Sequence, residues 1–152
     1  MIKGGNMTDR KATAKWKGSL AQGEGAIALG SGAFEGKFSF ATRMGDEPGT
    51  NPEELIAAAL AGCYSMALNA TLEKQGTPAT NVHSEAIVHF GKDDAGFAIR
   101  GIDLQTKAVV PGISDADFQQ VAETVKETCP VSKALAAVKI DLNAELVKGS
   151  AA

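Results

Sequence analysis

Apolar and polar residues change their periodicity along this chain, and each change predicts a different element. Within residues 11–43, polar and apolar positions alternate, as where Lys15 and Lys17 flank Trp16. A period of two is typical of strands, and closely spaced glycines indicate turns between them. The pattern predicts an N-terminal antiparallel meander whose third strand covers residues 37–43.

A nearly continuous apolar run follows a loop rich in Gly and Pro. Residues 55–68 are apolar or small at almost every position. Pro52 is suited to the first position of a helix, and the acidic Glu53 and Glu54 suit its first turn. We expect a helix from Pro52 to about Lys74. Because it is apolar on nearly every face, it must be covered on all sides.

The second half of the chain predicts two long strands, two helices and a final strand. The strands are expected over residues 79–90 and 97–110. A helix capped by the segment Ser114-Asp-Ala-Asp117 follows and ends near Cys129-Pro130. A short helix over residues 131–137 and a last strand over 138–147 complete the chain. This order of elements is α+β rather than alternating βαβ. We expect a single domain over residues 1–152, with residues 1–10 flexible or loosely attached.

Composition narrows the choice of partners. The chain has 152 residues, 44% of them hydrophobic and 22% charged, and a net charge of −3. Its basic residues are scattered, so neither nucleic acid nor an anionic membrane is expected as a partner. The N-terminus lacks the apolar stretch of a signal peptide, and the run over 55–68 is short for a membrane span. The expected location is the cytoplasm, where two cysteines are more often catalytic or metal-binding than cross-linked.

The two cysteines are the strongest chemical signal. Cys63 lies inside the apolar helix, and Cys129 directly precedes a proline. An apolar environment raises the pKa of a thiol, so a reactive Cys63 needs a cation nearby. Arg43 is the best candidate, because Arg10 lies in the polar N-terminal segment and Arg100 in the middle of a strand. Arg43 could equally be an ordinary solvated surface residue.

Glu53 also has two interpretations. It could interact only with the helix dipole, or it could orient Arg43 through a bidentate ion pair. Glu53 and Cys63 are ten residues apart, about 15 Å along a straight helix at about 1.5 Å per residue. They could meet only between chains. Small residues in the same helix would let two copies approach closely, so we infer an interlocked homodimer with composite sites.

Cys129 is expected at the N-cap of the short helix that Pro130 opens, where backbone donors would stabilise a thiolate. This position suits a resolving thiol, although a packing role is also possible. His83 and His89 lack the spacing of a zinc site, and we expect neither a metal nor a bound cofactor.

Two segments together resemble a known family. They are NPEELIAAALAGCYSMAL over residues 51–68 and CPVSKAL over residues 129–135. The combination is similar to the OsmC/Ohr family (osmotically inducible protein C and organic hydroperoxide resistance protein), and Thr42-Arg43 fits the OsmC branch better. The resemblance implies an OsmC-like α+β fold with antiparallel sheets and a long central helix, in an intertwined homodimer. It extends over nearly the whole chain.

The resemblance also implies a thiol-dependent peroxidase for organic hydroperoxides, acting in oxidative or osmotic stress defence. Cys63 would be peroxidatic and Cys129 resolving, through a Cys63–Cys129 disulfide. Arg43 would stabilise the thiolate, Glu53 would orient Arg43, and Glu54 has a less certain role. An external dithiol or lipoyl-type reductant would restore the thiols.

Two alternatives remain open at this point. One is a non-catalytic stress or ligand-binding protein on the same scaffold. The other is a redox sensor whose disulfide switches a partner. For the enzyme, an apolar pocket including Tyr64 and Met44 would explain a preference for alkyl hydroperoxides.

Overall fold

The structure, a computed structural model, describes residue 5 and residues 7–149. The chain divides into two compact units, the first ending at Pro52 and the second beginning at Glu53. The single domain predicted over the whole chain stays a prediction, and within residues 1–10 the positions 1–4 and 6 lie outside the described residues.

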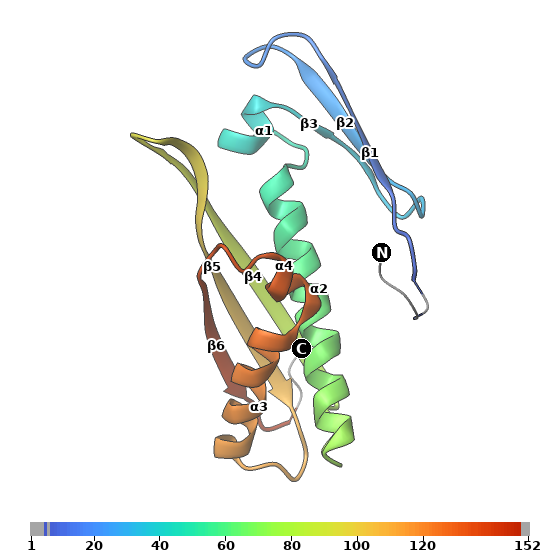
Figure 1. The fold of residues 1–152 in the computed structure, drawn as a ribbon, viewed down its shortest axis with the longest axis vertical. Coiled ribbons are helices and arrows are strands. Elements are labelled where there is room, and N and C mark those ends of the chain that lie inside the picture. Colours follow the sequence, from blue (N-terminus) through green and yellow to red (C-terminus); the bar gives the residue numbers. More distant parts are fainter. Residues whose placement is uncertain (1–4, 6, 150–152) are drawn as a thin grey trace. The chain divides into compact units, whose positions relative to one another are not determined.

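The first unit contains the predicted meander. Its strands β1 (Ala12–Lys17), β2 (Glu24–Leu29) and β3 (Glu35–Phe38) form an antiparallel sheet in the order β1-β2-β3 (Figure 1). The rings of Trp16 and Phe38 are 5.4 Å apart on this sheet. The turn after β1 places Gly18 at a φ of 94°, which favours glycine.

The prediction for the third strand is wrong beyond Phe38. The chain leaves the sheet at Ser39 and forms the short helix α1 (Phe40–Met44). The Ser39 hydroxyl accepts a hydrogen bond from the Thr42 amide at 3.1 Å, and the Thr42 hydroxyl accepts one from the Ser39 amide at 2.8 Å. This reciprocal capping favours a helix over continued strand. Arg43 therefore lies in the last turn of α1.

The long helix is confirmed. Helix α2 (Pro52–Lys74) has the predicted bounds and carries Glu53 and Glu54 in its first turn. One side of it is fully buried at intervals of four residues, at Leu60, Tyr64, Leu68 and Leu72. Met66, on another side, is 77% exposed. The cover that the sequence requires on all sides is thus present on one side.

By length and composition α2 could also cross a membrane. It has 23 residues and a mean hydropathy of 1.6 in its most apolar stretch. The whole helix is thus longer than the apolar run over residues 55–68, which by itself is short for a membrane span. One such helix is weak support for a membrane protein, because a core helix has the same composition. The buried leucines of α2 favour the core helix.

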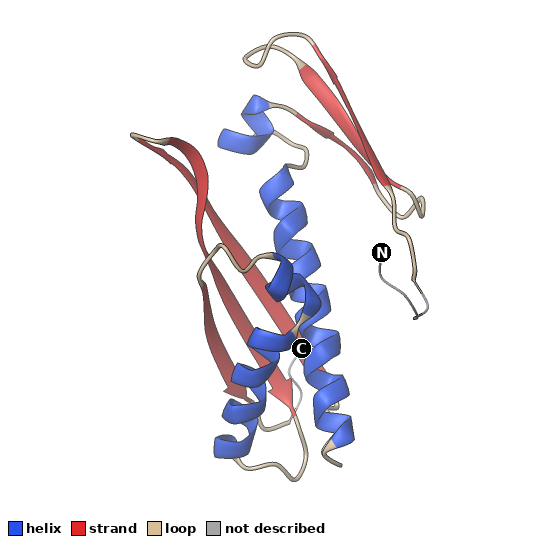
Figure 2. Cartoon of the chain, in the orientation of Figure 1, coloured by secondary structure: helices blue, strands red, loops and turns tan. Residues whose placement is uncertain are grey.

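The second unit is built on a mixed sheet in the order β4-β5-β6 (Figure 2). Strands β4 (Asn81–Asp93) and β5 (Gly96–Val109) pair antiparallel, with an irregularity between His89 and Phe90. Strand β6 (Ile140–Leu146) pairs parallel to β5. Parallel neighbours require a long crossover, which here contains helices α3 and α4.

Helix α3 (Asp115–Thr128) is capped by Ser114 as predicted. Helix α4 (Pro130–Ala134) is shorter than predicted, and β6 begins later. Helices α2 and α3 pack with the sheet around one core. Its fully buried larger side chains are Leu60, Tyr64, Leu68, Leu72, Ile102, Leu104, Phe118, Val125 and Cys129. The α+β fold class is confirmed, with two small sheets and a long helix.

Tyr64 gives a direct test of this core. Its hydroxyl donates to the Ala122 carbonyl at 3.0 Å, linking α2 to α3. Burial, followed by the charges of Glu123 and Cys129, raises its pKa well above the usual value. Tyr64 is the only tyrosine, so tyrosinate absorbance reports this side chain alone. We expect the folded protein to show no tyrosinate at about pH 10, where the unfolded chain ionises.

The buried Tyr64 also makes the stability of the fold depend on pH. A raised pKa stabilises the fold below about pH 10, and this contribution is lost as pH rises above that value. Tyr64→Phe should cost about 1 kcal/mol at neutral pH through the lost hydrogen bond, and it should lose less stability at alkaline pH than the wild type. Chemical denaturation of the variant and the wild type at neutral and alkaline pH measures these differences in the free energy of unfolding. Normal tyrosine titration in the folded protein would contradict the buried position.

Candidate active site

The fold brings the two cysteines into contact. The sulfur of Cys63, in the middle of α2, lies 3.1 Å from the sulfur of Cys129 between α3 and α4. Both are free thiols. A disulfide bond is about 2.0 Å long, so a shift of about 1 Å would suffice for bonding. The close contact of α2 with α3, including the Tyr64–Ala122 hydrogen bond, supports this arrangement.

Pro130 determines how Cys129 is presented. A residue before proline is disfavoured in the helical region, and Cys129 adopts φ −55° and ψ 127°. Helix α3 therefore ends there, with the Cys129 amide donating to the Val125 carbonyl at 2.9 Å. The Cys129 carbonyl accepts from the Lys133 amide at 3.0 Å and begins α4. Cys129 is thus the N-cap of α4, as predicted, and its side chain is fully buried.

The two thiols have opposite electrostatic environments. Burial raises the pKa of Cys63, the Val131 backbone amide lowers it in part, and the neighbouring Cys129 raises it further. Burial also acts to raise the pKa of Cys129. There it is outweighed by the Ser132 amide, the Cys63 thiol, the Ser132 hydroxyl and the Val131 amide, so the pKa falls below its usual value.

Thiol and thiolate form one titrating pair in such a contact. The 3.1 Å separation permits a hydrogen bond in either direction. The donors around Cys129 favour the negative charge on that sulfur and the proton on Cys63. Within the second unit, the local environment alone therefore prepares Cys129, rather than Cys63, as the thiolate.

The cysteine that is less favoured as a thiolate is the more accessible to solvent. Cys63 is partly exposed, whereas Cys129 has no exposed surface. A reagent from solvent therefore reaches the Cys63 sulfur first. The buried sulfur can react only with a group already formed on Cys63.

The structure does not bring all the predicted residues together. Arg43 is exposed and belongs to the first unit, whereas both cysteines belong to the second, so its place beside Cys63 stays a prediction. In α2, Glu53 is 7% exposed and Glu54 is exposed. A buried carboxylate requires a charged or hydrogen-bonded partner. Glu53 and Cys63 are on the same continuous helix, about 15 Å apart along its axis.

Tyr64 cannot line an open substrate pocket in the second unit, because it is fully buried and its hydroxyl is hydrogen-bonded within the core.

Ser132 is a site residue that the sequence did not predict. Its hydroxyl is buried and makes no hydrogen bond within the described part of the chain. The motif contained this serine, but burial without a partner becomes visible only in the fold.

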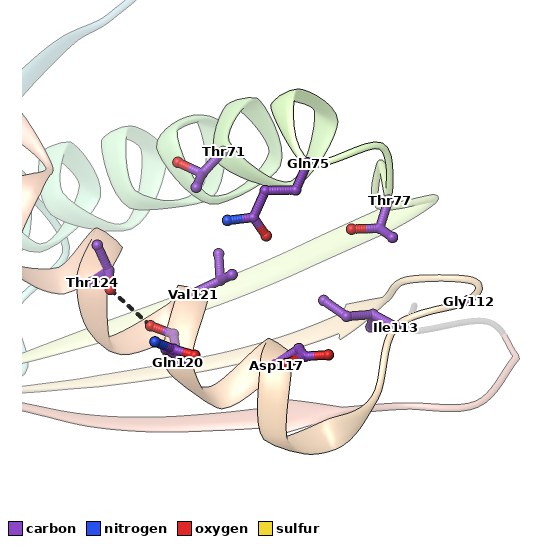
Figure 3. A pocket seen from close by; sticks show the side chains of 9 residues that line it. All are labelled: Thr71, Gln75, Thr77, Gly112, Ile113, Asp117, Gln120, Val121 and Thr124. Atoms are coloured by element: carbon purple, nitrogen blue, oxygen red, sulfur yellow. Dashed lines mark hydrogen bonds between the residues drawn. The ribbon is translucent and has the colours of Figure 1, made fainter.

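A cavity of about 400 Å³ opens between the C-terminal part of α2 and α3 (Figure 3). Three hydroxyls line it, and each already donates to a backbone carbonyl: Thr71 to Ala67, Thr77 to Leu72 and Thr124 to Gln120. Neither cysteine contributes to the lining. The cavity is therefore separate from the thiol pair.

His89 takes part in a separate polar contact. His89 is on β4, with Nε2 2.8 Å from Asp103 Oδ2, and both side chains are about half exposed. Across residue 5 and residues 7–149, no three His, Cys, Asp or Glu side chains are grouped so that they could hold a metal ion.

Comparisons with known proteins agree with the thiol site. The family described as "OsmC-like protein" matches residues 45–143. "Peroxiredoxin OsmC" of Escherichia coli strain K12 is 42% identical over 129 residues, covering 84% of this chain and 90% of the relative. "Organic hydroperoxide resistance protein" of Xanthomonas axonopodis pv. citri strain 306 is 31% identical over 115 residues, covering 73% and 78%.

A solved structure shows the same fold. The organic hydroperoxide resistance protein OhrB of Bacillus subtilis matches with a TM-score of 0.67 and 27% identity, covering 90% of this chain and 98% of that one. The names of these relatives indicate a peroxidase-like role in stress defence.

The contact between the sulfurs predicts rapid internal oxidation. Diamide, a thiol-specific oxidant, should convert both thiols into one intramolecular disulfide, because the sulfurs need to move by only about 1 Å. Intact mass should fall by two hydrogens per chain, and the far-ultraviolet circular dichroism should not change. The control is the same oxidation in denaturant, where the 66-residue separation should slow the reaction. Disulfides between chains on a non-reducing gel would contradict the contact.

Proposed function

Because the chain belongs to the family of OsmC-like proteins, we propose that it is a thiol peroxidase that reduces organic hydroperoxides to alcohols. The observation that carries this proposal is the pair of adjacent thiols with unequal access, Cys63 partly exposed and Cys129 buried. One sulfur can meet a hydroperoxide, and the other is in place to react with the product.

Cys63 is the peroxidatic residue. Its thiolate attacks the hydroperoxide oxygen that is remote from the alkyl group. A sulfur–oxygen bond forms, the oxygen–oxygen bond breaks, and the alkoxide takes the remaining proton of the thiol pair to leave as alcohol. Cys63 becomes a sulfenic acid, and Cys129 is left as the thiolate that its surroundings favour.

Cys129 then resolves the sulfenic acid. Its thiolate attacks the Cys63 sulfur, a disulfide forms, and the sulfur–oxygen bond breaks to release hydroxide, which solvent protonates to water. Since Cys129 is 3.1 Å from Cys63 and buried, resolution needs no rearrangement of the chain. Such rapid resolution protects Cys63 from further oxidation.

The first step requires a charge from outside the second unit. Burial raises the pKa of Cys63, so few Cys63 thiolates exist at neutral pH without a cation. Arg43 supplies this cation, and Glu53 orients the guanidinium through an ion pair. Glu54, the neighbouring carboxylate, would assist from its exposed position at the start of α2.

A homodimer completes this site. Glu53 is buried but about 15 Å along α2 from the Cys63 of its own chain, so it reaches a thiol only on a second copy. The exposed side of α2 carries Ala59, Gly62, Met66 and Ala70. A side chain added at Gly62 would meet nothing within 4 Å in its own chain. This surface permits the close approach of a second helix.

Turnover requires an external thiol reductant, either a lipoyl-type dithiol or a small thiol, because the chain has no further cysteine. The reducing cytoplasm is the compartment that supplies one. No bound cofactor takes part in this scheme, since the electrons come from the two thiols.

The peroxide reaction is tested by counting thiols after one equivalent of cumene hydroperoxide. The wild type should lose both thiols quickly, and more slowly with hydrogen peroxide. Cys129→Ser should accumulate a sulfenic or over-oxidised Cys63, whereas Cys63→Ser should stay inert. Subsequent dithiol should restore the wild type through many turnovers. Survival of both thiols would favour a binding role, and oxidation without catalytic recycling would favour a redox sensor.

The composite site is tested by complementation. Arg43→Ala should reduce the rate of Cys63 oxidation at neutral pH by about tenfold or more, because a nearby cation lowers a thiol pKa by about 1–3 units. Arg100→Ala, at an exposed arginine paired with Asp93, is the control and should react normally. Co-expressed Arg43→Ala and Cys63→Ser chains should regain one working site per dimer if Arg43 acts across the interface.

Light scattering on the same samples measures the assembly. A stable monomer of 15.6 kDa would contradict the dimer. Absence of complementation between intact dimers would instead place Arg43 in the same chain as its cysteine.

A further inference from the structure

The hydroxyl of Ser132 is buried without a hydrogen-bond partner among the described residues. The residue is 6% exposed, in the first turn of α4, three positions after Cys129. Its Oγ makes no hydrogen bond within the described residues. An unpartnered buried hydroxyl is destabilising, and such groups are rare in folded proteins. Retaining one directly beside a reactive thiol suggests a state of the site in which it has a partner.

That partner is identified by the surroundings of Cys129. A buried thiolate requires hydrogen-bond donors or a cation. The groups that favour negative charge on Cys129 are two backbone amides, the Cys63 thiol and the Ser132 hydroxyl. The Ser132 hydroxyl is thus close enough to influence the sulfur, and it is one of only two side chains among these donors.

The other side-chain donor is consumed by the reaction. Once Cys63 has taken up the hydroperoxide oxygen, its sulfur no longer carries a proton to donate. At that moment Cys129 must be a thiolate in order to attack. The sulfenic O–H of Cys63 is the leaving group and lies on the side of the sulfur opposite to the attacking thiolate, so of the two side chains only the Ser132 hydroxyl is then in place to stabilise the charge.

We propose that Ser132 is a positioning residue for the resolving step, and that its hydroxyl donates a hydrogen bond to the Cys129 sulfur when this sulfur is a thiolate. In the structure the hydroxyl has no hydrogen-bond partner among the described residues, and we assign this arrangement to the thiol state. In the thiolate state it holds the charge on Cys129 and directs the sulfur at Cys63. This role in catalysis rests on the proposed peroxidase function, whereas the hydrogen bond to the thiolate does not.

The first measurement therefore needs no peroxide. In the Cys63→Ala variant, Cys129 is the only thiol, and ultraviolet thiolate absorbance against pH gives its pKa. Adding Ser132→Ala should raise this pKa by about one unit, the size expected for a hydrogen bond to a charged group. Ser132→Thr, which keeps a hydroxyl, should leave the pKa of Cys129 as it is in the Cys63→Ala variant.

Ser65→Ala is the matched control. Ser65 is two residues from Cys63, but its hydroxyl is hydrogen-bonded to Ser84 at 2.7 Å. Its removal should leave the pKa of Cys129 unchanged. Because the Ser132 hydroxyl has no partner in the thiol state, Ser132→Ala should not lower the midpoint of unfolding at acidic pH. A loss of stability there, with an unchanged pKa, would identify a structural role and overturn the proposal.

The second measurement follows the resolving step. In otherwise wild-type protein, Ser132→Ala should slow disulfide formation after cumene hydroperoxide by up to about tenfold at neutral pH. The pH profile should move upward by the same shift as the pKa, while consumption of hydroperoxide by Cys63 should not slow, because a proton retained on Cys129 favours the thiolate on Cys63. Over-oxidised Cys63 should accumulate in the variant at excess hydroperoxide.

The outcomes separate the two proposals. A raised pKa without any peroxide reaction in the wild type would support the hydrogen bond and contradict the peroxidase function. A normal peroxide reaction in the wild type, with an unchanged pKa of Cys129 and unchanged resolution in Ser132→Ala, would support the peroxidase function and contradict the role of Ser132.

Discussion

The contact between the Cys63 and Cys129 sulfurs is the constraint on which the chemistry of this protein depends. It requires α2 and α3 to pack at one fixed separation, because the sulfurs lie only 3.1 Å apart. The core supplies that rigidity through fully buried side chains from both helices and from the sheet, and through the Tyr64 hydrogen bond. Protein interiors are packed as densely as organic crystals. The resolving thiol is therefore held in place by the same contacts that stabilise the second unit.

The two cysteines depend on different parts of the molecule for their ionisation. Donors near α4 lower the pKa of Cys129, whereas burial raises that of Cys63. The second unit alone thus prepares the thiol that acts second. In the proposed mechanism, the thiol that acts first depends on Arg43, so its activation is coupled to correct assembly. A chain without that assembly would hold two close thiols of low reactivity toward hydroperoxides.

Much of the fold could be predicted from local signals. Pro52 with its acidic neighbours defined the start of α2, and Pro130 defined the change from α3 to α4 at Cys129. The helix α1 was missed because Phe38 and Phe40 continue a strand-like alternation, whereas the Ser39–Thr42 capping pair ends the strand. The 3.1 Å contact joins residues 66 positions apart, and only the complete packing could reveal it. The unpartnered hydroxyl of Ser132 could not be predicted for the same reason.

Two unsatisfied requirements of the chain have one common solution. Among the described residues of the first unit, only Thr42 and Thr50 are buried, so its sheet has no apolar core of its own. The exposed side of α2 is likewise apolar, with Met66 77% exposed. Burial of apolar surface stabilises proteins by about 25 cal/mol per Å², so covering both surfaces would be strongly favourable. A second copy would cover them and would also bring a buried Glu53 to a thiol that it cannot reach along its own helix. The proposed dimer would therefore serve the chemistry of the proposed site as well as the burial of hydrophobic surface.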